Sequence, residues 1–280
     1  MKLYLTTILA SLFLSQASYG QSRKVIPAGN DLVVTAFEMG FYFGQINDKV
    51  EPELDRQTKE QVINATQAKK IRSYIKRIFV RSNLSNFAAK TVASKMDVNV
   101  LQKFRGWFSK PIGQKLYDAF AARENPNYKL EKDKYFITYG QAKIKNNRIN
   151  VIRTYLINSK TLENIATAEL GARYAIDMGR DGLRPKGTQE RPLSVYNRLK
   201  PIQSYYLTKP TDELLKDYIY LFRNLTNREI DSYSKFLTTP LGAKIVAGAN
   251  EAFTLTIQQA GATVSNRIVK ERSSTYIPDL

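Results

Sequence analysis

One pattern of sixteen residues occurs twice in this chain, and it restricts the fold more than any other feature of the sequence. Residues 101–116 and 230–245 align without a gap, at an offset of 129 positions. Two aromatic positions and one hydroxyl position match, and a proline, a glycine and a lysine are identical; the matched pairs are Phe104/Tyr233, Trp107/Phe236, Ser109/Thr238, Pro111/Pro240, Gly113/Gly242 and Lys115/Lys244. A duplicated unit of this kind predicts two similar halves.

The residue types of this unit predict a corner between two helices. A first helix ends on aromatic residues, a Ser or Thr stops it and can cap the next helix, and a proline begins that helix. The glycine two positions later allows another backbone or an aromatic ring to approach closely. We favour this packing role for the motif. If the motif instead binds a ligand, the candidate binding residues are Trp107, Phe236, Lys115 and Lys244.

The paired motif resembles that of a family of exported bacterial helical proteins that carry a domain of unknown function. The signature of that family is aromatic residues followed by Ser/Thr-Pro-x-Gly-x-Lys, and the resemblance covers roughly residues 80–122 and 210–255. The first copy departs from it, because Lys110 separates Ser109 from Pro111, whereas Thr239 directly precedes Pro240. The resemblance implies a periplasmic helical bundle and brings no known activity or catalytic residue.

Helical periodicity extends through the rest of the chain, and long segments that alternate with period two are missing. The sequence therefore predicts an all-α fold, a helical bundle built from two related halves. Asp97, Thr211 and a Thr226/Glu229 capping box mark helix starts. The first expected helix is capped by Asn30 or Asp31 and runs through Phe43. Further helices are expected at 53–81, 84–96, 98–109, 111–123, 132–145, 148–158, 160–178, 193–207, 211–224, 227–238 and 240–271.

The expected organisation has five parts. The chain divides into a signal peptide at 1–20, an exposed leader at 21–29, a first helical half at 30–124, a helical connector and loop at 125–192, and a second helical half at 193–280. The clearest break is the Gly- and Pro-rich stretch 179–192. Whether the two halves form one bundle or two lobes stays open at this point.

The N-terminus has the order of a secretory signal peptide: a positive charge at Lys2, an apolar run at 3–14 and a short polar segment. Small residues at Ser18 and Gly20 favour cleavage before Gln21, and a cut before Ser18 is the alternative. A membrane anchor is disfavoured, because the apolar run is about a dozen residues and a span needs about 20. We expect a periplasmic or secreted protein without a stable membrane span, and no lipoprotein, because no cysteine follows.

The chain contains neither cysteine nor histidine. This composition excludes thiol nucleophiles, the usual histidine bases and most zinc, copper and haem sites. Phosphate-binding glycine loops and acidic calcium loops are also missing, so we predict no cofactor, no metal and no enzymatic activity. Glycan cleavage needs only two carboxylates and survives as an alternative. Its candidate residues are Glu38, Glu163, Glu169 and Asp177.

The charge is strongly positive, with 43 basic and 25 acidic residues, or +18. Such a field attracts polyanions, although a basic surface can also serve solubility alone. In an exported protein, envelope polymers and lipid head groups replace nucleic acid as the expected partners. One face of the expected helix 53–81 is especially basic; its residues are Lys69, Lys70, Arg72, Lys76 and Arg77. This face is either solvated or lies against an anionic membrane.

These features favour a non-enzymatic exported protein that binds an anionic envelope polymer, a lipid head group or an exported client protein through a basic and aromatic surface. An envelope glycan-cleaving enzyme that uses a carboxylate pair is one alternative. A periplasmic chaperone or assembly factor is the other, and it would need an exposed apolar patch or cradle.

Overall fold

The computed structural model describes residues 26–139, 145–207 and 211–274 of the chain. Within these ranges it contains thirteen helices and no strand, which confirms the predicted all-α fold. The helices are α1 Gly29–Ala36, α2 Met39–Lys59, α3 Ala65–Ile78, α4 Arg81–Lys95, α5 Val98–Phe108, α6 Pro111–Ala122, α7 Tyr128–Tyr139, α8 Asn146–Asn158, α9 Thr161–Gly182, α10 Pro192–Tyr206, α11 Asp212–Leu221, α12 Asn227–Thr238 and α13 Pro240–Ser274. The predicted signal peptide lies outside the described residues.

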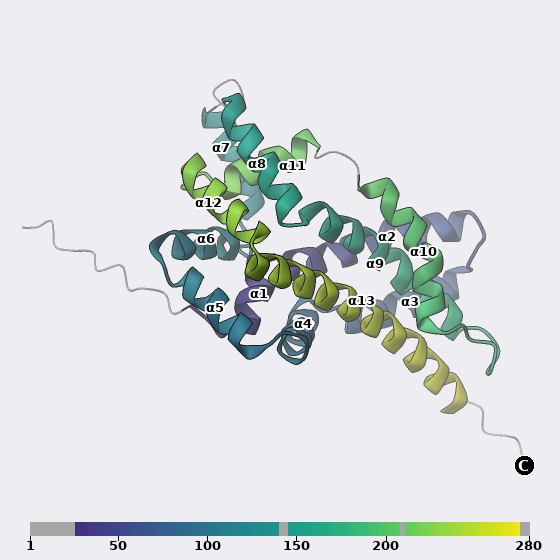
Figure 1. Ribbon diagram of the computed structural model, residues 1–280. Helices are drawn as coiled ribbons and strands as arrows, with labels where there is room; N and C mark the ends of the chain where they lie inside the picture. Colours follow the sequence, from purple (N-terminus) through teal and green to yellow (C-terminus); the bar gives the residue numbers. More distant parts are fainter. Residues whose placement is uncertain (1–25, 140–144, 208–210, 275–280) are drawn as a thin grey trace, which may run out of the picture.

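The longest described helix, α13, starts beside α12 and runs to the lower right end of the molecule (Figure 1). It packs against α9, α4 and α3, and α9 packs in turn against α2 and α10. Buried side chains from both expected halves belong to one continuous core. Phe43 of α2, for example, stacks on Phe253 of α13 with ring centroids 4.9 Å apart. The two halves therefore share a core.

Side-chain caps explain several helix starts, as the sequence predicts. Asp97 and Thr211 accept hydrogen bonds from the second and third amides of α5 and α11. Thr226 and Glu229 form the predicted capping box at the start of α12. At α1 the prediction is wrong: the helix starts after Ala28 without a side-chain cap, and neither Asn30 nor Asp31 serves as one.

Two expected helices have different boundaries. The first is interrupted at Glu38, whose backbone is left-handed with φ 53°, and α2 then continues through Pro52. The buried residues Val50 and Leu54 hold the chain on either side of that proline, so packing overrides its unfavourable propensity. The expected helix 53–81 is two helices, because Asn64 starts α3 with a capping box of its own.

Smaller differences occur elsewhere. Helix α9 extends to Gly182, so the loop expected at 179–192 is shorter. Residues 132–145 are helical up to Tyr139, and 140–144 lie outside the described residues. In the expected exposed leader, Ile26 is only 7% exposed, because it packs into the core and its carbonyl accepts a hydrogen bond from Arg105. None of the helices in the described part combines the length and apolar character needed to cross a membrane.

Candidate functional site

Both copies of the repeated pattern fold as two helices joined by a corner, α5–α6 and α12–α13, and their aromatic residues face each other. Trp107 and Phe236, both candidate binding residues, stack with ring centroids 4.8 Å apart and planes 23° apart. Tyr233 lies 5.2 Å from the Trp107 ring. Each half-buried ring is therefore covered by the other copy, which is the packing role that the sequence favours.

The two matched glycines of the pattern lie at close contacts between successive helices. A Cβ at Gly113 would collide with the backbone of Phe108, and one at Gly242 would collide with the carbonyl oxygen of Phe236. The corners differ in their caps. Thr239 accepts a hydrogen bond from the Gly242 amide at 3.1 Å, whereas Lys110 at the matching position of the first copy provides no side-chain cap.

The two lysines of the pattern have different surroundings. Lys115 donates to Glu229 at 2.7 Å, and Glu229 also caps α12. The Lys115 ammonium, together with the Thr226 amide, lowers the pKa of the Glu229 carboxyl. Lys244 is exposed on α13 and forms no ion pair with a described residue. Of the four candidate binding residues, Lys244 alone is both exposed and free of a described partner.

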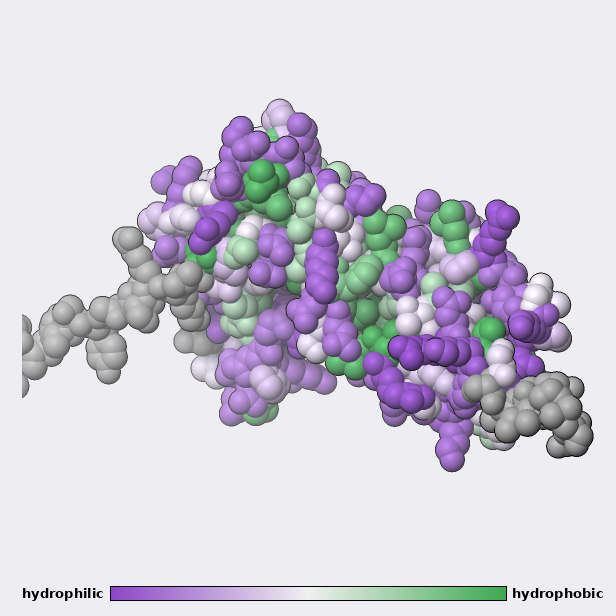
Figure 2. Space-filling view, turned by 90° about the horizontal axis from the view of Figure 1, so that it is seen from below, coloured by the Kyte–Doolittle hydropathy of each residue, from purple (hydrophilic) through white to green (hydrophobic). Residues whose placement is uncertain are grey.

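A different surface gathers unpaired positive charge. Helix α3, residues 267–273 of α13 and the loop 183–191 meet at one end of the molecule, which we call the basic end. This end lies on the right of Figures 1 and 2, and hydrophilic side chains cover much of it. On α3, Arg72 and Lys76 pair with Glu51 of α2, whereas Lys69 is exposed and has no described ion pair.

Between α3 and α13 lies a groove of about 500 Å³, the Arg267 groove. Its cations are Arg77, Arg267 and Lys270, all exposed, and none of the three forms an ion pair with a described residue. The groove has one carboxylate, Glu271, which accepts from Tyr74 and lies 3.4 Å from Lys70. The Arg77 guanidinium lies over the Tyr74 ring, 4.6 Å from its centroid.

A second groove of about 280 Å³ adjoins the loop 183–191 and has no acidic residue in its lining. Its cationic residues are Arg184, Lys186 and Arg272. Arg272 donates to the backbone carbonyls of Leu183 and Arg184 at 2.5 and 2.6 Å, which ties the loop to the end of α13. Lys186 is exposed without a described ion pair.

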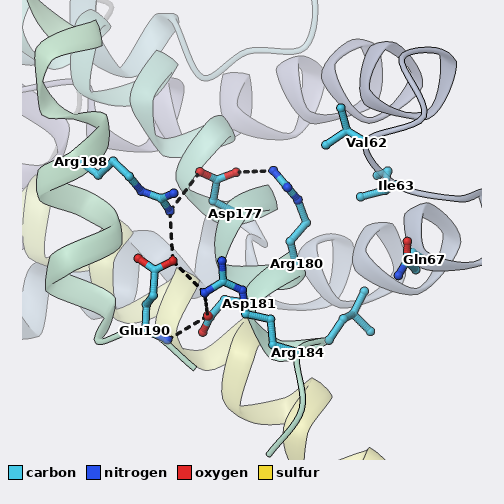
Figure 3. Close-up of a pocket in the computed structure, with 10 residues that line it drawn as sticks. Val62, Ile63, Gln67, Asp177, Arg180, Asp181, Arg184, Glu190 and Arg198 are labelled. Atoms are coloured by element: carbon cyan, nitrogen blue, oxygen red, sulfur yellow. Dashed lines mark hydrogen bonds and ion pairs between the residues drawn. The ribbon is translucent and has the colours of Figure 1, made fainter. Parts of the chain in front are cut away.

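A cleft of about 210 Å³ continues this surface toward α10, and we call it the Asp177 cleft (Figure 3). Arg198 lies 3.8 Å from Asp177 and 3.7 Å from Glu190, so one guanidinium joins the two carboxylates. Arg184 lies 2.8 Å from Glu190. Burial raises the pKa of Asp177, although Arg180 and Arg198 oppose the shift.

The four carboxylates singled out for glycan cleavage lie at different places. Glu38 is buried against Arg123, and the half-buried Glu169 pairs with Lys49, so each has the basic partner that burial requires. Glu163 pairs at 2.7 Å with Lys160, which lies three residues earlier at the start of α9. Only Asp177 combines a raised pKa with a cleft that holds a second carboxylate.

Sequence reasoning found the cations of α3 but not those of α13. Arg267 and Lys270 are three positions apart in the sequence, which places them on one helical face and is the signal that could have revealed them. Among the described residues, no group of acidic side chains could hold a metal ion. Protein-family models, characterised proteins and solved structures were compared with this chain, and none matches it.

Proposed function

We propose that this chain is an exported, periplasmic or secreted helical protein without enzymatic activity, which binds an anionic component of the cell envelope through its basic end. The observation that carries the proposal is the Arg267 groove, where three exposed cations lack a described ion pair. Unpaired cations in a groove can bind phosphate groups without first breaking an internal ion pair. The aromatic residues that the sequence offered for binding pack against each other, so the basic surface supports the proposal alone.

The shared chemistry of the ligand is phosphate, from a lipid head group or an anionic polymer. We expect the purified protein to co-sediment with phosphatidylglycerol vesicles but not with phosphatidylcholine vesicles, and the bound fraction should fall as salt rises. Polyphosphate and lipopolysaccharide, added as competitors, distinguish a polymer from a membrane surface. Absence of salt-sensitive binding to all of these probes would overturn the proposal.

The groove is tested by charge reversal at three positions, Arg77→Glu, Arg267→Glu and Lys270→Glu. Each basic residue near an anionic surface contributes about 1 kcal/mol, and its reversal adds a similar repulsion, so the triple variant should lose more than about a thousandfold in affinity. The matched control reverses three exposed cations outside the basic end, Lys90, Lys103 and Arg228. Equal losses in both variants would show that total charge, and not the groove, determines binding.

Export is tested separately by the N-terminal sequence of the protein recovered from the cell envelope or medium. The predicted signal peptide gives Gln21 as the first residue, and Ser18 as the alternative. Recovery of the protein with Met1 and Lys2 still attached would contradict cleavage.

A second candidate function, glycan cleavage, is favoured by the Asp177 cleft. Asp177 and Glu190 both lie near the same nitrogen of Arg198, so their carboxylates are closer than the roughly 10 Å that such a pair requires. A general acid also needs a raised pKa, and Asp177 has one. Release of soluble sugars from purified peptidoglycan, lost in Asp177→Asn and Glu190→Gln, would support this function. No release by the unmodified protein would exclude it for that substrate.

A further inference from the structure

Another cleft lies apart from the basic end and is lined by different residues. It has a volume of about 580 Å³ and lies between α2, α7, the first turns of α9 and α11. Small-molecule sites usually have volumes of 300–1,000 Å³, with apolar walls and a few polar groups that fix orientation. We call it the Arg123 cleft, after the buried arginine in its lining.

The inner wall of this cleft is held by a buried ion-pair cluster. Arg123, whose side chain is 2% exposed, donates to Glu38 and Asp217, and its guanidinium lies 3.9 Å from the centroid of the Phe41 ring. Lys132 lies 2.9 Å from Asp217, and Tyr218 donates to Glu38. The two positive charges of Arg123 and Lys132 therefore neutralise the two carboxylates. This wall is preorganised and needs no bound counter-ion.

The whole lining of the cleft is also charge-balanced, in a chain whose net charge is +18. It includes four cationic and four carboxylate side chains. Several are paired, as Lys49 is with Glu169. Two exposed charges of opposite sign, Asp48 and Lys129, form no ion pair with a described residue. The side-chain amide of Gln45, which also lines the cleft, forms no hydrogen bond with a described residue. A ligand with one positive and one negative group complements this pair.

The remaining wall is apolar. Phe41, Leu162, Ile165 and Leu214 line the cleft and are all only half-buried, so part of each side chain stays open to it. Covering such surface gains about 25 cal/mol per Å². From the balanced charges and this wall we propose that the Arg123 cleft binds a small zwitterionic amphiphile, a molecule with a short apolar tail and a head that carries both charges. This site is independent of the basic end and of the function proposed for it.

The test uses four decyl amphiphiles with one tail and different heads, below their critical micelle concentrations. Isothermal titration calorimetry should give the highest affinity for decylphosphocholine, ahead of decyl maltoside, decyl sulfate and decyltrimethylammonium. Trp107, the single tryptophan, lies in the repeat interface and not in the cleft, so its unchanged fluorescence checks that the protein stays folded. Affinities that do not depend on the head, or a preference for decyl sulfate, would overturn the proposal.

Variants then place the binding in the cleft. Ile165→Trp fills the apolar wall and should weaken decylphosphocholine binding by more than about tenfold. Ile157→Trp is the matched control, because Ile157 is 61% exposed on α8 and does not line the cleft. Asp48→Ala and Lys129→Ala change exposed residues and should each weaken binding by about threefold to tenfold. Unchanged affinity in these two variants would refute the site even if Ile165→Trp fails to fold, and vesicle binding by the basic end should persist in both.

Discussion

The two ends of α13 use charged and aromatic residues in opposite ways. At its start lies the corner region, residues 98–123 and 227–246, where rings stack on rings and Arg123 is buried between two carboxylates. At its other end, the basic end presents Arg267 and Lys270 without a described ion pair. A repeated motif can therefore serve packing, whereas Arg267 and Lys270, which belong to no motif, form the more accessible charged surface.

The corner region and the basic end should differ most in how much the free energy of unfolding falls when an arginine is replaced. Arg123→Met leaves Glu38 and Asp217 without their main partner, and breaking a buried ion pair costs about 3–5 kcal/mol. Arg267→Met at the basic end should change the free energy of unfolding by less than about 0.5 kcal/mol. Urea denaturation of both variants measures the difference. Adding Glu38→Gln to Arg123→Met should recover part of the loss; equal stability of the two single variants would refute the comparison.

A glycine substitution tests the corner itself. Gly242→Ala places a methyl group against the Phe236 carbonyl, and overpacking of this kind costs about 1–3 kcal/mol. Gly106→Ala is the control, because nothing lies within 4 Å of the added Cβ and alanine favours the helix by up to about 1 kcal/mol. The midpoints of thermal and urea denaturation should therefore fall for Gly242→Ala and rise for Gly106→Ala. A Gly242→Ala protein as stable as the unmodified one would show that the corner can relax.

Two lysines on the same helix, Lys244 and Lys270, differ in their expected role in vesicle binding. Lys244→Glu and Lys270→Glu change the net charge equally, and both side chains are exposed on α13. Reversal at the basic end removes one favourable contribution and adds a repulsive one, about 2 kcal/mol in total, so vesicle affinity should fall roughly thirtyfold. Lys244→Glu should lower it by less than about threefold. A larger effect of Lys244→Glu would return the binding role to the repeated motif.

The sequence predicted the corner region better than the basic end, and the reason is distance along the chain. Proline, glycine and the capping residues of a corner act within a few positions of one another, so their spacing is visible in the sequence. The Arg267 groove is lined by both Arg77 and Arg267, and these two residues are far apart in the chain. The break at Glu38 was missed for the same cause, since its left-handed backbone is accompanied by a contact to Arg123.

The smallest expected effect separates the matching lysines of the two copies. Lys115 pairs with Glu229, but its side chain is 55% exposed, so Lys115→Met should cost less than about 1 kcal/mol at pH 7. The folded-state pKa of Glu229 lies below its usual value, so this stabilisation is present above the unfolded-state pKa and is lost as pH falls through the folded-state pKa. Urea denaturation at pH 7 and at about pH 3 should therefore show a difference from the unmodified protein that shrinks in acid. Lys244→Met, which removes no described ion pair, should show no such pH dependence, and the same trend in both variants would mean that the copies do not differ here.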